Sequence, residues 1–252
     1  MAGIYKMSFR ERPVRLTSRH MDLQYLEVAK TIDHALLRPS TTDAEIEAGC
    51  ELARRLDVAS VCVVPHALAR VVRLLAGSNV LPTTTIGFPH GAHTTACKLR
   101  EATEAIHTGA LELDMVINVG KALSDDLAYV RREIDEVLGA ARGAGVKLKV
   151  IFETCYLERV HKLALCKICS ELGVDWVKTS TGFGSAGATA SDVRLMREST
   201  SPNVQVKASG GIRTLAQLLE LRALGASRIG TSSSEAILAE ARERCAAFDA
   251  QK

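Results

Sequence analysis

Residues 173–182 read Gly-Val-Asp-Trp-Val-Lys-Thr-Ser-Thr-Gly, and this stretch indicates how the chain folds. Gly173 is typical of the left-handed cap that ends a helix, and Asp175–Ser180 is an apolar run of strand-forming residues that breaks at Gly182. The same pairing of a glycine stop with an apolar opening residue precedes other strand-like runs, at Gly109-Ala110, Gly145-Val146 and Gly225-Ala226. This repetition predicts helices that alternate with short strands.

The whole chain follows this rhythm. The candidate strands are Thr31–His34, Ala59–Val64, Thr83–Ile86, Leu111–Asn118, Lys147–Glu153, Asp175–Ser180, Val204–Ser209 and Ser227–Thr231. The clearest helix between them runs from about Ser124 to Arg142, with apolar residues at helical spacing on one face. Strands separated by single helices pair in parallel through right-handed crossovers. The prediction is therefore an α/β protein with a (β/α)₈ TIM barrel, and an open doubly wound sheet is the alternative.

Length and composition predict one compact domain. The 252 residues are 47% hydrophobic and 24% charged, and no stretch is apolar for long enough to cross a membrane. The net charge of +3 is too small to favour nucleic acid as a partner, whereas a small anionic substrate is compatible with it. The seven scattered cysteines favour reduced thiols and a cytoplasmic location.

Residues 1–27 form a predicted basic N-terminal arm or extension, and residues 28–252 the predicted barrel domain. The arm carries several basic residues in its first 20 positions against one acidic residue, Glu11. A frayed arm is the main interpretation, and import into an organelle is the alternative.

Two lysines occupy the ends of neighbouring candidate strands, and this pairing suggests amine catalysis. Lys178 ends the sixth strand and Lys207 the seventh, so both side chains can point into one barrel mouth. A second cation nearby favours the neutral, nucleophilic form of an amine. Asp114, in the fourth strand, is a candidate for moving protons. The alternatives are solvated lysines at strand ends and a structural ion pair at Asp114.

Residues of other candidate strands are predicted to support the two lysines and Asp114. Asp33 lies in the first strand, Cys62 in the second, and Lys149 and Glu153 share one face of the fifth. Glycines and serines follow the last three strands, where backbone N–H groups can bind phosphate. The candidate phosphate-binding residues are Gly182, Gly210, Gly211, Gly230, Ser232 and Ser233. Ordinary turn glycines and an N-cap serine are the alternative interpretation.

Three other patterns are weak. Residues 182–187 match the dinucleotide pattern G-x-G-x-x-G, but the following strand ends in Lys207 and offers no acid to hold a ribose. The pair His90 and His93, and the pair Cys166 and Cys169, lack the further ligands of a metal site. We therefore predict no cofactor and no metal.

Six blocks of sequence, taken together, resemble the deoxyribose-phosphate aldolase family over about residues 28 to 240. They are Ile32–Pro39, Gly87–Gly91, Glu112–Asn118, Lys149–Thr154, Val177–Phe183 and Val206–Arg213, in the family's order. The resemblance implies a metal-free class I aldolase on a (β/α)₈ barrel. Such an enzyme reversibly cleaves 2-deoxy-D-ribose 5-phosphate into D-glyceraldehyde 3-phosphate and acetaldehyde.

The resemblance also implies roles for individual residues. Lys178 falls on the Schiff-base lysine, Lys207 on the second lysine that keeps the first amine neutral, and Asp114 on the carboxylate that transfers protons through a water. The glycines and serines named above match the phosphate-binding loops. Phe183 departs from the pattern, because some members carry a lysine there, and the final residues 248–252 lack the tyrosine with which some members end.

Other functions remain open at this point. The chain could be another Schiff-base aldolase or transaldolase acting on a different sugar phosphate, or a barrel that binds a sugar phosphate without turnover. The expected partners are a small sugar phosphate and acetaldehyde, with no nucleic acid and no membrane, and a homo-oligomer is compatible with the sequence.

Overall fold

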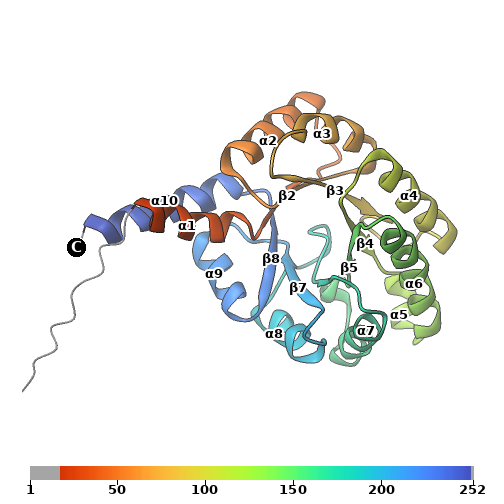
Figure 1. Ribbon diagram of the computed structural model, residues 1–252. Helices are drawn as coiled ribbons and strands as arrows, with labels where there is room; N and C mark the ends of the chain where they lie inside the picture. Colours follow the sequence, from red (N-terminus) through yellow and green to blue (C-terminus); the bar gives the residue numbers. More distant parts are fainter. Residues whose placement is uncertain (1–17, 251–252) are drawn as a thin grey trace, which may run out of the picture.

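The strands of the protein close into one parallel barrel (Figure 1). The computed structural model describes residues 18–250. The strands are β1 Ile32–Leu36, β2 Ser60–Val63, β3 Leu81–Ile86, β4 Glu112–Val116, β5 Lys147–Ile151, β6 Trp176–Lys178, β7 Gln205–Ser209 and β8 Ala226–Thr231. Each strand pairs in parallel with the next, and β8 pairs with β1. The predicted (β/α)₈ barrel is confirmed, and the open sheet is excluded.

Helices surround the barrel and connect its strands. They are α1 Ser18–Ala29, α2 Asp43–Leu56, α3 Leu68–Leu75, α4 Thr95–Thr108, α5 Val119–Leu123, α6 Leu127–Gly143, α7 Arg159–Leu172, α8 Ala190–Ser199, α9 Leu215–Ala223 and α10 Ser234–Ala250, with short 3₁₀ turns η1 Pro65–Ala67 and η2 Thr154–Tyr156. Gly109 and Gly173 cap α4 and α7 in the left-handed conformation, as the sequence predicts.

The helix predicted from Ser124 begins three residues later. Ser124 ends the separate helix α5, and the Asp126 carboxylate accepts a hydrogen bond from the Tyr129 N–H to start α6 at Leu127. The predicted boundary was wrong because Ser124 is the C-cap of α5 and its hydroxyl donates to the Gly120 carbonyl at 2.8 Å, which leaves Asp126 to cap α6.

The strands separate an apolar layer from a charged interior. In β4, Leu113 and Met115 face the surrounding helices and are completely buried, whereas Glu112 and Asp114 face the barrel axis. The apolar layer between strands and helices is the hydrophobic core. The barrel interior can therefore contain charged side chains.

The two ends of the described chain lie side by side in α1 and α10 (Figure 1). The Tyr25 hydroxyl donates to the Leu56 carbonyl at 3.1 Å, and the Arg242 guanidinium lies 4.6 Å from the centre of the Tyr25 ring. Helix α1 thus includes the last ten residues of the predicted arm. Residues 1–17, on which the import alternative depends, lie outside the described residues.

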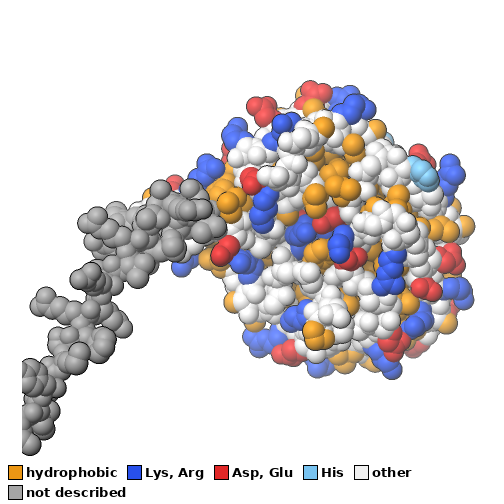
Figure 2. Space-filling view, in the orientation of Figure 1, with side chains coloured by type: hydrophobic (Ala, Val, Ile, Leu, Met, Phe, Trp, Pro, Cys, Tyr) orange, Lys and Arg blue, Asp and Glu red, His pale blue; other side chains and the backbone are white. Residues whose placement is uncertain are grey.

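The charged surface is mixed in sign. On the face drawn in Figure 2, lysine and arginine side chains alternate with aspartate and glutamate. Among residues 18–250, no helix combines the length and hydropathy needed for a membrane span.

Candidate active site

A cluster of buried charged side chains fills the barrel beneath the carboxyl ends of the strands. Asp114 lies at its centre: its Oδ2 is 2.7 Å from both the Lys178 and the Lys207 Nζ atoms, and its Oδ1 is 2.8 Å from Lys149 Nζ. All four side chains are at most 3% exposed. The structure therefore brings together the two strand-end lysines and the carboxylate that the sequence indicates.

A second layer of charge lies below these residues. Lys207 also contacts Asp33, and the Asp33 Oδ1 accepts hydrogen bonds from Ser60 at 2.7 Å and Arg228 at 2.6 Å. Arg228 and Lys149 both bind Glu112, at 3.0 Å and 2.5 Å. The sequence analysis missed Glu112 and Arg228 as site residues. The available signal was their spacing: each lies two residues before a predicted site residue of the same strand, Asp114 in β4 and Gly230 in β8, and so shares its face.

The cluster holds one more basic group than acidic groups. Four basic side chains, Lys149, Lys178, Lys207 and Arg228, share three carboxylates, Asp33, Glu112 and Asp114. A buried excess charge is unfavourable, so the neutral state of the cluster has one basic group deprotonated.

The environment selects Lys178 as that group. Burial lowers the pKa of Lys178, Asp114 opposes this effect, and the neighbouring Lys207 ammonium lowers the pKa further, so the net pKa is below that of an ordinary lysine. Burial also lowers the pKa of Lys207, but Asp114 and Asp33 outweigh it and the net pKa is raised. Lys178 is therefore the more readily neutral, nucleophilic amine of the two.

The carboxylate between them stays ionised. Burial raises the pKa of Asp114, but Lys149, Lys178 and Lys207 outweigh burial and hold this pKa well below its usual value. The same balance raises the pKa of Lys149, because Asp114, Glu112 and Asp33 outweigh its burial. Lys149 is thus a permanent cation that fixes one oxygen of Asp114, and the other oxygen faces the two lysines.

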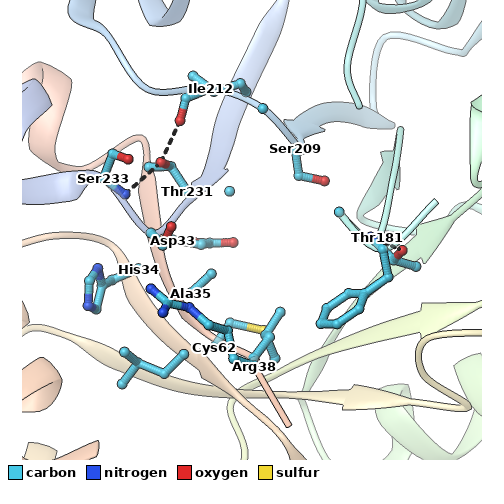
Figure 3. Close-up of a pocket in the computed structure, with 18 of the residues that line it drawn as sticks. Asp33, His34, Ala35, Arg38, Cys62, Thr181, Ser209, Ile212, Thr231 and Ser233 are labelled. Atoms are coloured by element: carbon cyan, nitrogen blue, oxygen red, sulfur yellow. Dashed lines mark hydrogen bonds between the residues drawn. The ribbon is translucent and has the colours of Figure 1, made fainter. Parts of the chain in front are cut away.

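A pocket of about 410 Å³ borders the two lysines. Figure 3 shows other residues that line it, among them Asp33, Cys62 and Ser233. Its lining includes Lys178, Lys207, Asp33 and Cys62, and the predicted phosphate-binding residues Gly182, Gly210, Gly211, Gly230, Ser232 and Ser233. All the predicted site residues except Asp114, Lys149 and Glu153 therefore line one cavity. A ligand in it reaches the amine at one end and the glycine loops at the other.

Two of the glycines are required by close packing. Gly210 has φ of 89°, and a Cβ there would lie 2.8 Å from the Gly187 Cα. A Cβ on Gly230 would lie 2.9 Å from the Ser209 Cβ and 3.3 Å from the Lys207 Cε. Any side chain at these positions would displace the pocket wall or the second lysine. The absence of a side chain therefore lets the Gly210 backbone pack against Gly187 at the pocket wall and the Gly230 backbone pack against Lys207.

Hydrogen bonds fix the loop that precedes α10. The Thr231 hydroxyl donates to the Ile212 carbonyl at 2.7 Å and accepts from the Ser233 N–H at 2.9 Å (Figure 3). His34 Nδ1 lies 2.9 Å from the hydroxyl of Ser234, the first residue of α10. Burial lowers the pKa of His34 to about 4, so the ring is neutral at pH 7. The positive end of the α10 dipole thus lies beside the pocket.

Two supporting residues differ from their predicted placement. Glu153 does not continue β5, which ends at Ile151; it adopts a left-handed conformation with φ of 57° and binds the Thr181 N–H at 3.2 Å. The predicted strand was too long because the chain turns into η2 at Thr154. Burial raises the pKa of the Cys62 thiol to about 12, so Cys62 lies in the site as a neutral group.

The weak patterns fall within ordinary structure. In the loop 182–187, Gly182 and Phe183 line the pocket, and the Phe183 ring packs edge-on against Phe88 at 5.4 Å between ring centres. Cys166 and Cys169 are buried in α7. No cluster of three or more metal-binding side chains occurs within the described part of the chain.

The sequence and the fold both match known aldolases. The profile of the DeoC/LacD family aldolases matches residues 27–239. The chain belongs to this family.

The relatives place the chain more closely within the family. A deoxyribose-phosphate aldolase of Rhodopirellula baltica is 55% identical over 223 residues, which cover 88% of this chain and 92% of that protein. The crystal structure of a putative deoxyribose-phosphate aldolase from Coccidioides immitis has a TM-score of 0.83 at 35% identity and covers 90% of this chain and 98% of the other. A deoxyribose-phosphate aldolase from Aeropyrum pernix, described as a unique tetrameric structure, has a TM-score of 0.78 at 29% identity over 89% of this chain and 98% of the other.

Proposed function

We propose that the protein is a class I aldolase that reversibly cleaves 2-deoxy-D-ribose 5-phosphate into D-glyceraldehyde 3-phosphate and acetaldehyde. One observation carries the proposal: a buried lysine of lowered pKa, Lys178, shares a carboxylate with a second lysine of raised pKa, Lys207, at the base of a pocket. The relatives named deoxyribose-phosphate aldolase support the choice of substrate.

The reaction begins at the Lys178 amine. Neutral Lys178 attacks the C1 aldehyde of the open-chain sugar and forms a carbinolamine, which takes up a proton and loses water to give a protonated Schiff base. Asp114, which contacts both amines at 2.7 Å, is placed to move these protons. The Lys207 ammonium keeps Lys178 neutral before the attack and donates to Asp114 throughout.

Carbon–carbon cleavage follows from the protonated Schiff base. The C3 hydroxyl loses its proton, the C2–C3 bond breaks, and its electron pair moves into the iminium to form an enamine. Cleavage at C2–C3 is required because it alone divides the five-carbon sugar into glyceraldehyde 3-phosphate and two-carbon acetaldehyde. The enamine then takes a proton at C2, and water hydrolyses the resulting Schiff base to release acetaldehyde and the free Lys178 amine.

The phosphate is proposed to bind at the opposite end of the pocket. Gly182, Gly210 and Gly211 have φ of 90°, 89° and 78°, a backbone geometry that turns successive N–H groups towards a ligand. Gly230, Ser232 and Ser233 precede α10, whose N-terminus favours a negative group. Glu153 supports this wall by holding Thr181 through its N–H.

Borohydride trapping tests the mechanism. The protein is reduced in the presence of 2-deoxyribose 5-phosphate, digested, and mapped by mass spectrometry. The expected result is one covalent adduct on Lys178, together with enzymatically detected acetaldehyde in the unreduced reaction. An adduct on Lys207 alone would reverse the two roles, and products other than acetaldehyde would assign a different sugar phosphate.

Assembly and location are also part of the proposal. We propose a homo-oligomer in the cytoplasm, supported by the tetrameric description of the Aeropyrum pernix relative and by seven cysteines that are all free. Sedimentation of the full chain tests the first point. A single monomeric species at micromolar concentration would refute it.

A further inference from the structure

Arg38 lies at the phosphate end of the pocket without an assigned role. It belongs to the loop between β1 and α2 and lines the same cavity as Ser232 and Ser233. Figure 3 shows its side chain extending into the pocket beside Ala35 and His34. The Thr41 N–H donates to the Arg38 carbonyl at 3.0 Å, so the turn that carries Arg38 is hydrogen-bonded.

The guanidinium of Arg38 lies near one carboxylate, that of Glu45, without forming an ion pair with it. Among the ion pairs of the residues with described side chains, 24–246, none involves Arg38. Glu45 also lines the pocket, and its carboxylate accepts from the Thr42 N–H at 2.7 Å and the Thr42 hydroxyl at 3.0 Å as part of a capping box. These two hydrogen bonds and, to a smaller extent, the charge of Arg38 lower the pKa of Glu45, so Arg38 is partly balanced but is not held by this carboxylate. By contrast, Arg70 on the outside of the barrel binds both Asp43 and Glu47 at 2.7 Å.

Apart from Arg38 and Arg213, the pocket lining supplies little free positive charge. Lys207 is held by Asp33 and Asp114, and the phosphate loops offer neutral backbone N–H groups. Phe183 presents an apolar ring on the opposite wall. A phosphate monoester carries about −1.5 to −2 charges at pH 7, and a planar guanidinium binds two of its oxygens at once. Arg213, after β7, is a second arginine at the rim.

We propose that Arg38 binds the phosphate of the substrate and makes the enzyme selective for the phosphorylated sugar. This inference rests on the proposed function, because the phosphate is that of 2-deoxyribose 5-phosphate. Arg38 clamps the phosphate from the β1 side of the pocket, opposite the glycine loops that follow β6 and β7. It contacts no reacting atom, so its effect falls on phosphate recognition rather than on the Lys178 amine.

The test compares two substrates in four proteins. The ratio of kcat/KM for 2-deoxyribose 5-phosphate to that for unphosphorylated 2-deoxyribose is measured in the wild type, Arg38→Gln, Arg38→Lys and the control Arg100→Gln, an exposed arginine on α4. Arg38→Gln is expected to lower kcat/KM for 2-deoxyribose 5-phosphate about 10- to 100-fold, as for a lost charged hydrogen bond. It is expected to change kcat/KM for unphosphorylated 2-deoxyribose by less than about twofold. Arg38→Lys retains part of the selectivity, and Arg100→Gln retains all of it.

Two outcomes would overturn the role of Arg38. Equal losses on both sugars would show that the arginine supports the loop, and unchanged values would show that it does not meet the phosphate. If the wild type does not cleave 2-deoxyribose 5-phosphate, the proposed function fails, and Arg38 is then judged by titration with inorganic phosphate. Weaker phosphate binding by Arg38→Gln than by Arg100→Gln supports it, and equal binding refutes it.

Discussion

The protein buries lysines in two places, and the two differ in how their charge is matched. Outside the barrel, between α4 and α6, Lys98 and Glu133 form a completely buried pair at 2.7 Å. Lys98 also donates to the Val116 carbonyl at 2.8 Å, and Glu133 accepts from the Asn118 N–H at 2.6 Å. Inside the barrel, four basic groups share three carboxylates, and Lys178 reaches a pocket.

The difference separates a structural lysine from a reactive one. Burial lowers the pKa of both Lys98 and Lys178, so a lowered pKa alone does not distinguish them. Lys98 has one carboxylate of its own and joins β4 to two helices. Lys178 shares its carboxylate with two other lysines and borders the pocket. An excess of cations together with access for a substrate is what turns a buried lysine into a nucleophile.

Replacing each lysine by methionine gives the sharpest test of this comparison. Lys178→Met is expected to lower kcat by about 10⁴-fold or more, because no other amine takes its place as the nucleophile. Its free energy of unfolding should change little, since Lys178 is the neutral amine of the cluster and its removal leaves three basic groups beside three carboxylates. Steady-state kinetics and urea denaturation check the two expectations, and substantial activity in Lys178→Met would contradict the mechanism.

The matching change outside the barrel is expected to affect stability instead. Lys98→Met leaves the Glu133 carboxylate buried without its cation, which costs about 3–5 kcal/mol of unfolding free energy. Adding Glu133→Gln removes the unpaired charge and should restore most of that loss, because the amide oxygen still accepts from the Asn118 N–H. The kcat per folded molecule stays near the wild-type value. A large loss of kcat in folded Lys98→Met would erase the distinction between the two regions.

The second lysine of the cluster is expected to act through the pH dependence. Lys207→Met removes the cation that lowers the pKa of Lys178, so this pKa rises and less neutral amine is present at pH 7. Since one pKa unit is a tenfold change in the neutral fraction, kcat/KM at pH 7 should fall about 10- to 100-fold and recover in part as the pH is raised. A uniform loss at all pH values would assign Lys207 a different role.

The sequence predicts the barrel well because the fold repeats a local pattern. A glycine followed by an apolar residue precedes four of the strands, as at Gly173, and apolar strand runs recur along the chain, so an error of a few residues, as at Ser124, leaves the topology unchanged. The strand-end lysines were also predictable, because residues at the carboxyl ends of barrel strands meet in one place.

The partners of these lysines were harder to predict because they depend on how the barrel closes. Arg228 meets Glu112 across the interior from a strand 116 residues away, and no local pattern indicates that contact. Lys98 and Glu133 lie in helices and resemble surface charges in the sequence; only the packing of α4 against α6 buries them. Arg38 follows a strand but lies in a loop, so its direction depends on the turn before α2.

Replacing Cys62 has the smallest expected effect on activity, and it tests whether a neutral side chain beside the charged cluster contributes to catalysis. It lines the pocket and is 2% exposed, but burial raises the pKa of its thiol to about 12, so it carries no charge to perturb the lysines. Cys62→Ala should therefore keep kcat/KM within about threefold of the wild type. Iodoacetamide at pH 8 should modify the exposed Cys97 first, with mass spectrometry locating the label and activity retained. Rapid labelling of Cys62 with loss of activity would instead show a reactive thiolate, and the reactivity of the site would then not rest on its lysines alone.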